Sequence, residues 1–147
     1  MVEKKQVLIV DDQLGIRVLL NEVFRSEGYE VTMAASAAEA LQAVRLSMPD
    51  LVIHDLVMPD VDGWESIERL LQVNDRLPII TMSAYGPADK PRALVTKPFD
   101  IDEFISFARQ VLDGTVTLKS PYYVPPSATV NSSAGGWLPS MYRKLRL

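Results

Sequence analysis

Carboxylates follow two of the apolar segments in this 147-residue chain. The segment Val7–Val10 runs straight into Asp11 and Asp12, and the segment 51–54 runs into Asp55. Adjacent negative charges repel one another, and partial burial strengthens the repulsion. A positive group is therefore expected beside them. A hard divalent cation such as Mg²⁺ meets that need because it prefers oxygen ligands.

A hydroxyl and an ammonium group follow two later apolar segments, at Ser83 and Lys97. A metal ion, an ammonium group and a hydroxyl around one carboxylate form a site for a tetrahedral oxyanion such as a phosphoryl group. A carboxylate can also attack phosphorus and form an aspartyl phosphate. Asp55, expected alone at the centre of the sheet edge, is the predicted nucleophile, with Asp11 and Asp12 holding the metal. The alternative is that the aspartates only cap the next helix.

The spacing of apolar residues predicts strands alternating with helices. Strands are expected over 6–10, 30–34, 51–55, 78–83 and 92–96, and helices over 14–27, 36–47, 64–73 and 100–112. Ser36 and Glu39 have the spacing of a capping box, and Gly28 and Gly114 follow two helix ends. This alternation predicts an α/β fold with a doubly wound parallel sheet, which binds ligands at the carboxyl ends of its strands.

Composition narrows the class of protein. Apolar residues make up 48% of the chain and charged residues 23%, which are globular values. The chain has no cysteine, which excludes disulfides, thiolate metal ligands and a cysteine nucleophile. All 19 acidic residues lie in 1–114, whereas 115–147 carries only basic charges. An acidic domain is a poor nucleic-acid binder. With no signal-peptide pattern and no membrane-length apolar segment, the expected location is cytoplasmic.

The motifs together resemble the response-regulator receiver domain of two-component signalling. The resemblance covers residues 5–113 and rests on VLIVDD, VIHDLVMPDVDG, ITMSAYG and TKPFDIDEF. Within that family, VDDQLGIRVLLNEVF, MSAYG and TKPFDIDE resemble the stand-alone receiver of the sporulation phosphorelay in spore-forming bacteria. The resemblance implies a flavodoxin-like five-stranded sheet of order 2-1-3-4-5. It also implies a phosphoryl acceptor rather than a turnover enzyme.

The resemblance assigns a role to each matched residue. Asp55 is the phospho-acceptor, and Ser83 and Lys97 hold phosphoryl oxygens. The implied Mg²⁺ ligands are Asp12, Asp55 and the backbone carbonyl of Val57, with Asp11 acting mainly through bound water. The implied donor is a sensor histidine kinase, and the implied recipient is a histidine phosphotransferase. No direct contact with nucleic acid or membrane is expected.

The resemblance also implies a partner-docking surface on the first helix and the loop after the fifth strand. Its residues are Gln13, Leu14, Ile16, Leu20, Pro98 and Phe99. Core packing is the alternative for the apolar ones. Ile16 and Leu20 fit either interpretation, whereas Leu14 and Phe99 adjoin the site and are better partner candidates.

Two features depart from the family pattern. Only AYGPADKPRALVT separates Ser83 from Lys97, so the fourth helix is expected to be shortened or absent. That leaves a face of the sheet for a homodimer or for the tail 115–147, which is Pro/Ser/Gly-rich, carries aromatic residues and matches no recognised domain. The alternative is a disordered tail or a non-native terminus. Leu94 also stands where the family has an aromatic switch residue, and plain core packing is the favoured interpretation.

The positions around the acceptor carry further expectations. His54, the only histidine, should point away from Asp55, because neighbours in a strand face opposite sides. It is predicted to be a packed or hydrogen-bonded structural residue. Apolar or aromatic groups at Val57 and Tyr85 should hinder an attacking water, so slow self-hydrolysis is predicted.

Two rival functions stay open. The first is a receiver-like binding module that works without phosphorylation, which the short crossover and Leu94 favour. The second is a Mg²⁺-dependent phosphatase with an aspartyl intermediate. That class places a second aspartate two residues after its nucleophile, whereas Gln13 follows Asp11 at that spacing. A flavin-binding function fits the fold order, but the chain lacks a phosphate-cradling loop after the first strand.

Overall fold

The computed structural model describes residues 3–56, 58, 61–83, 94–96 and 101–115. The strands in this part of the chain are β1 (Gln6–Val10), β2 (Glu30–Ala34), β3 (Leu51–Asp55), β4 (Ile79–Ser83) and β5 (Leu94–Thr96). The helices are α1 (Leu14–Ser26), α2 (Ala37–Leu46), α3 (Gly63–Val73) and α4 (Ile101–Leu112).

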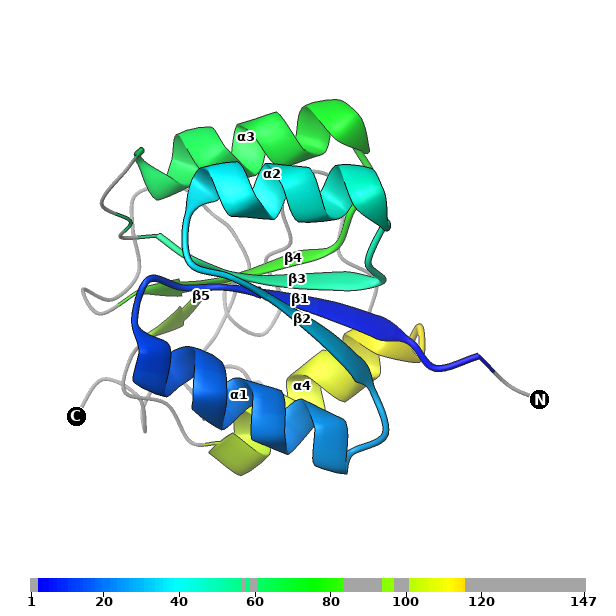
Figure 1. The fold of residues 1–147 in the computed structure, drawn as a ribbon. Helices are drawn as coiled ribbons and strands as arrows, with labels where there is room; N and C mark the ends of the chain where they lie inside the picture. The colour runs from blue at the N-terminus through cyan, green and yellow to red at the C-terminus, as the bar shows by residue number, and fades with distance from the viewer. Residues whose placement is uncertain (1–2, 57, 59–60, 84–93, 97–100, 116–147) are drawn as a thin grey trace, which may run out of the picture.

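The strands form one parallel sheet of order β2-β1-β3-β4-β5. Helices α2 and α3 cover one face of this sheet, and α1 and α4 cover the other (Figure 1). The predicted doubly wound, flavodoxin-like sheet is therefore confirmed, including its strand order. No helix among the described residues has the length and apolar character needed to cross a membrane.

Alternation along the strands divides the core into two apolar layers. On the α1/α4 face, Ile9 and Ile53 pack with Phe24 and Phe104, whose rings meet edge to face with centroids 6.2 Å apart. On the α2/α3 face, a second cluster joins residues of β1 and β3 to the inner sides of α2 and α3. Each fully buried large apolar side chain contributes about 1.5–3 kcal/mol. The two layers fix the central strands β1 and β3 side by side.

Local sequence signals set the helix ends. Ser36 caps α2 by accepting the Glu39 N–H at 3.2 Å, as its capping-box spacing predicts. Helix α1 ends in a Schellman motif at Gly28, whose φ of 96° favours glycine. There the Gly28 N–H donates to the Arg25 carbonyl, and the Tyr29 N–H donates to the Phe24 carbonyl. The Schellman motif reverses the chain between α1 and β2, and the Ser36 cap begins α2 directly after β2.

Several predictions fall outside the described residues. The predicted shortening or loss of the helix between β4 and β5, and the homodimer site there, concern residues 84–93. The predicted covering role of the tail concerns 116–147. The expected strand at 92–96 is described from Leu94 onwards. The side chain of Leu94 is not described, so the prediction that it is plain core stays a prediction.

Candidate metal centre

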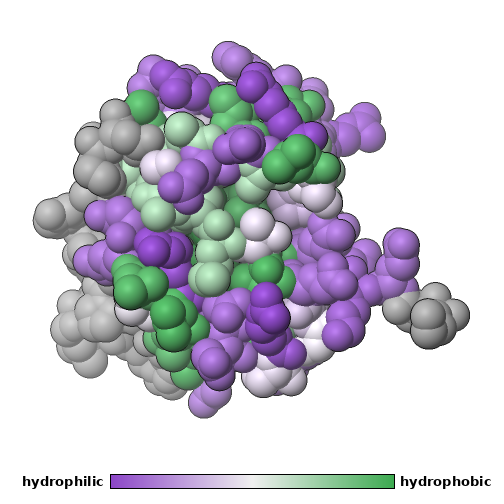
Figure 2. Space-filling view, viewed as in Figure 1, coloured by the Kyte–Doolittle hydropathy of each residue, from purple (hydrophilic) through white to green (hydrophobic). Residues whose placement is uncertain are grey.

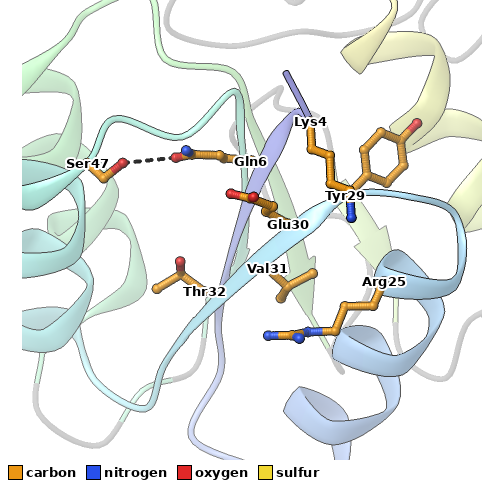
Figure 3. A pocket seen from close by; sticks show the side chains of 8 residues that line it. All are labelled: Lys4, Gln6, Arg25, Tyr29, Glu30, Val31, Thr32 and Ser47. Atoms are coloured by element: carbon orange, nitrogen blue, oxygen red, sulfur yellow. Dashed lines mark hydrogen bonds between the residues drawn. The ribbon is translucent and has the colours of Figure 1, made fainter. Parts of the chain in front are cut away.

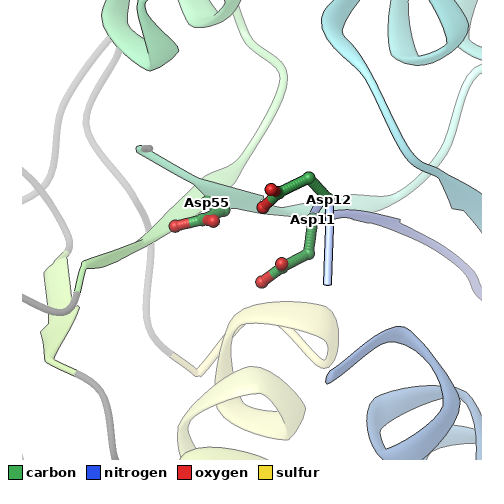
Figure 4. Close-up of side chains that lie close together, drawn as sticks. All are labelled: Asp11, Asp12 and Asp55. Atoms are coloured by element: carbon green, nitrogen blue, oxygen red, sulfur yellow. The ribbon is translucent and has the colours of Figure 1, made fainter. Parts of the chain in front are cut away.

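Three carboxylates converge where β1 and β3 end. The register aligns Val10 with His54, so the next residues, Asp11 and Asp55, leave the sheet at the same level. Side-chain oxygens of Asp11, Asp12 and Asp55 all lie within 4.8 Å of one another (Figure 4). Asp11 and Asp55 are buried, whereas Asp12 is exposed to solvent. The sequence prediction that these three residues meet at one edge is confirmed.

Hydrogen bonds hold the loop between β1 and α1 in place. The Asp11 N–H donates to the carbonyl of Ala34 at 3.1 Å. One Asp11 carboxylate oxygen accepts the Gln13 N–H at 2.8 Å. Gln13 is the N-cap residue of α1, and its own side chain makes no capping bond. The bond between Asp11 and Gln13 orders the residue that precedes α1, but it is not a helix cap, because Asp11 accepts from the N-cap residue and not from the first turn of the helix.

Arg17 is a residue of this centre that the sequence did not reveal. Its guanidinium donates to the main-chain carbonyl of Asp11 at 2.7 Å. This places a permanent positive charge beside the acidic pair, where sequence reasoning expected Lys97 and a metal ion to supply it. The only sequence signal is a basic residue in the second turn of the helix that follows the two aspartates.

The loop after Asp55 is closed by a close backbone approach. The Gly63 N–H donates to the Leu56 carbonyl at 3.2 Å. A Cβ atom on Gly63 would lie 2.2 Å from that carbonyl oxygen, so no larger residue fits without moving backbone. At the other side of the loop, the Leu56 N–H donates to the Met82 carbonyl at 2.9 Å. Strand β3 therefore ends in a constrained turn.

The donor set suits a small, hard cation. Carboxylate oxygens are the ligands that Mg²⁺ prefers, and Mg²⁺ keeps several waters, so two or three protein ligands suffice. Asp12 is the most accessible donor of the three, and the buried carboxylates gain the most from neutralisation. A bound Mg²⁺ would supply positive charge to the carboxylates and to a phosphoryl group placed against them.

The remaining predicted site residues are described only in part. Ser83 is the last residue of β4, at the edge where the carboxylates gather, but its side chain is not described. Val57, Tyr85, Lys97, Pro98 and Phe99 lie outside the described residues, so their roles stay predictions. The strand β5 ends at Thr96, one residue before Lys97.

The residues of the predicted partner surface differ in exposure. Gln13 is exposed, and Leu14, at 66% exposure, is among the most exposed large apolar residues described. Ile16 is half-buried and packs against the core. Leu20 is fully buried, which decides for core packing at that position. Figure 2 shows hydrophobic residues on the surface over the first turns of α1.

His54 faces away from the carboxylates, as strand alternation predicted. Its ring is fully buried on the α3 side and hydrogen-bonded to Ser66. The prediction of a hydrogen-bonded structural histidine is confirmed. Its particular partners were not foreseen.

A separate hollow lies at the opposite end of the sheet, where β1 and β2 begin. It measures about 560 Å³ and is open to solvent (Figure 3). Its lining residues include Lys4, Arg25, Tyr29 and Glu30. Charges of both signs line it, and it is remote from the carboxylates, so it contributes nothing to the metal centre.

The sequence matches the family model described as the response regulator receiver domain over residues 7–109. The chain therefore belongs to the response regulator receiver family. It is 42% identical over 116 residues to sporulation initiation phosphotransferase F of Bacillus subtilis (strain 168), covering 74% of this chain and 94% of that protein. It is 37% identical to the probable transcriptional regulator ycf27 of Cyanophora paradoxa, covering 78% of this chain but only 51% of that protein.

Solved structures show the same fold. A CheY-like receiver domain protein from Methanospirillum hungatei JF-1 aligns with a TM-score of 0.70 and 27% identity, over 76% of this chain and 96% of that chain. The response regulator protein TrrA from Thermotoga maritima, in complex with Mg(2+)-BeF, aligns with a TM-score of 0.64 and 33% identity, over 73% of this chain and 98% of that chain.

Proposed function

We propose that this receiver accepts a phosphoryl group on Asp55 with Mg²⁺ and passes it on within a phosphorelay. The observation that carries the proposal is the convergence of Asp11, Asp12 and Asp55 within 4.8 Å at the ends of β1 and β3. Membership of the receiver family supports it. The similarity to a sporulation phosphotransferase, of which this chain covers 94%, supports the relay in particular.

In the proposed reaction, a carboxylate oxygen of Asp55 attacks the phosphorus of a phosphohistidine on a sensor histidine kinase. A P–O bond forms, the P–N bond breaks, and its electron pair stays on the imidazole nitrogen. Asp11, Asp12, Asp55 and the Val57 carbonyl would hold the ion. Ser83 and Lys97 would hold phosphoryl oxygens. A histidine phosphotransferase would receive the group by the reverse chemistry.

The proposed partner surface is the exposed start of α1 with the loop after β5. Gln13 and Leu14 are exposed beside Asp12 in sequence, and Pro98 and Phe99 would complete the surface. Residues 1–114 would act as the receiver and 115–147 as an appended tail. Relay from an ATP-dependent kinase would place the protein in the cytoplasm. A homodimer would form through the sheet face that a short crossover between β4 and β5 would leave open.

Intact-mass analysis after incubation with acetyl phosphate and Mg²⁺ tests the proposal. One phosphoryl adduct is expected, and it should be lost in Asp55→Asn and in a sample containing EDTA. Circular dichroism should show all samples folded. No adduct in folded wild-type protein would refute phosphoryl acceptance and favour the phosphorylation-independent binding module.

A further inference from the structure

Polar side chains are buried on both faces of the sheet near the acceptor. Among the described residues, the buried polar ones are Asp11, His54, Asp55, Ser66 and Thr81. The two aspartates belong to the carboxylate cluster. The other three lie behind it: His54 and Thr81 are register partners on β3 and β4, and Ser66 projects from α3. Burying a polar group is costly unless it is hydrogen-bonded. The partners of these three side chains are therefore informative.

The imidazole of His54 bridges the acceptor strand and α3. Its Nδ1 lies 2.6 Å from the main-chain oxygen of Asp55, and its Nε2 lies 2.7 Å from the Ser66 hydroxyl. A carbonyl oxygen can only accept, so Nδ1 carries the proton and donates to Asp55. In the neutral ring, Nε2 then accepts the hydroxyl proton of Ser66.

These bonds complete the fixation of one peptide plane. The carbonyl of Asp55 and the N–H of Leu56 belong to the same rigid unit. The N–H donates to the Met82 carbonyl at 2.9 Å, and the carbonyl accepts from His54. With both ends of this plane held, the backbone rotation that sets the direction of the Asp55 side chain is restricted.

We propose that His54 is a positioning residue for phosphoryl transfer: through its Nδ1–H bond to the Asp55 carbonyl, it holds the acceptor carboxylate in its productive direction. This inference rests on the proposed function. His54 itself never touches the phosphoryl group, because its ring is fully buried on the far side of the strand. Its action is through the peptide that follows the acceptor.

Three substitutions separate the two bonds of the ring. The side-chain amide of His54→Asn can place an N–H where Nδ1 stands, whereas that of His54→Gln reaches the position of Nε2. His54→Leu removes both. Ser66→Ala is the matched control, because it removes the Nε2 partner and leaves the Nδ1–H bond in place.

The rate of adduct formation from acetyl phosphate, at saturating Mg²⁺, is the first measurement. His54→Asn and Ser66→Ala should stay within about threefold of wild type, and His54→Gln and His54→Leu should fall about tenfold or more. Urea unfolding of every variant shows whether rate merely follows stability. Equal rates for the Asn and Gln variants, or rates that simply rank with stability, would overturn the inference.

The tautomer gives a second, independent readout. Because His54 is the only histidine, ¹⁵N-histidine labelling yields a single imidazole in the NMR spectrum. The Nδ1–H tautomer is expected, and its Nδ1 signal should shift when beryllofluoride and Mg²⁺ are added to wild type but not to Asp55→Asn. An Nε2–H tautomer would overturn the inference. Wild type that forms no adduct would instead refute the proposed function, and the positioning role with it.

Discussion

Removing one charge from the carboxylate cluster should change stability in opposite directions with and without Mg²⁺. Asp12→Asn is the informative substitution because the residue is exposed and the amide has nearly the same shape as the carboxylate. The substitution removes one negative charge that lies within 4.8 Å of two others. Wild type should therefore be strained by repulsion when no divalent ion is present.

The distances set the size of the effect. Two unit charges 4.8 Å apart repel by about 0.9 kcal/mol in bulk water and by about 3.5 kcal/mol at an effective dielectric constant of about 20. Asp12 faces solvent, so the lower figure applies more closely to each of its two pairs. Asp12→Asn should raise the free energy of unfolding by about 1–2 kcal/mol in EDTA at low salt, and less at high salt.

Mg²⁺ should reverse which of the two proteins is the more stable. A ligand that binds only the folded state at 100 times its dissociation constant stabilises by about 2.7 kcal/mol. Wild type should gain this stabilisation, whereas Asp12→Asn, which has lost an anionic ligand, should gain little. In excess Mg²⁺ the wild type should therefore become the more stable protein.

Urea unfolding followed by circular dichroism, in EDTA and in Mg²⁺, measures both effects. Glu68→Gln is the control, because it removes one negative charge from an exposed position on α3 outside the cluster. It should not reproduce the crossover. A variant less stable than wild type in EDTA, or one that gains as much from Mg²⁺ as wild type does, would show that the three carboxylates do not form a strained metal site.

Three further predictions concern the fold that carries the site. Gly63→Ala should lower the free energy of unfolding by about 1–3 kcal/mol, because its methyl group would meet loop backbone. The control Gly15→Ala, with open space around the residue, should be neutral or stabilising. Equal losses of stability for the two variants in urea unfolding would contradict the clash. Burial and a nearby carboxylate raise the pKa of Tyr29 above its ordinary 10.0, so the folded state holds the proton longer than the unfolded state does. The stability that this residue contributes should therefore be present below pH 10 and lost as the pH rises through the folded pKa; Tyr29→Phe, unfolded in urea over the same pH range, should lack this loss, and identical pH profiles would refute it. The ion pair of Glu27 with Arg109 joins the end of α1 to α4. Because both side chains are partly exposed, a double-mutant cycle should give a coupling energy of about 0.2–1 kcal/mol that falls with added salt. Zero coupling at low salt would show that the pair does not hold the two helices together.

The carboxylate cluster was predictable because it follows from alternation and register alone. Once β1 and β3 are parallel neighbours, residues that follow them must meet at one edge. The face taken by His54 was predictable for the same reason. Its partner Ser66 was not, because the rotation of α3 about its own axis is set by packing against the sheet rather than by local sequence.

Contacts between side chains and main-chain atoms could not be predicted from the sequence either. Arg17 donates to a carbonyl that every residue possesses, so no pairing of side-chain types announces it. Leu20 and Ile16 both satisfy the helical apolar pattern, and only the packed structure shows that the first is fully buried and the second half-exposed. Sequence periodicity identifies the inner side of a helix but not where its margin lies.

The apolar layer beneath α1 and α4 also has a consequence for how the chain is made. It joins Val7, near the start of the chain, to Leu112, near the end of α4, and the Phe24 ring leans on that of Phe104. During vectorial synthesis, β1 and α1 leave the ribosome long before α4 exists. Part of their inner surface therefore stays uncovered until the last helix has emerged, and exposed apolar surface of this kind makes an incomplete chain prone to aggregation.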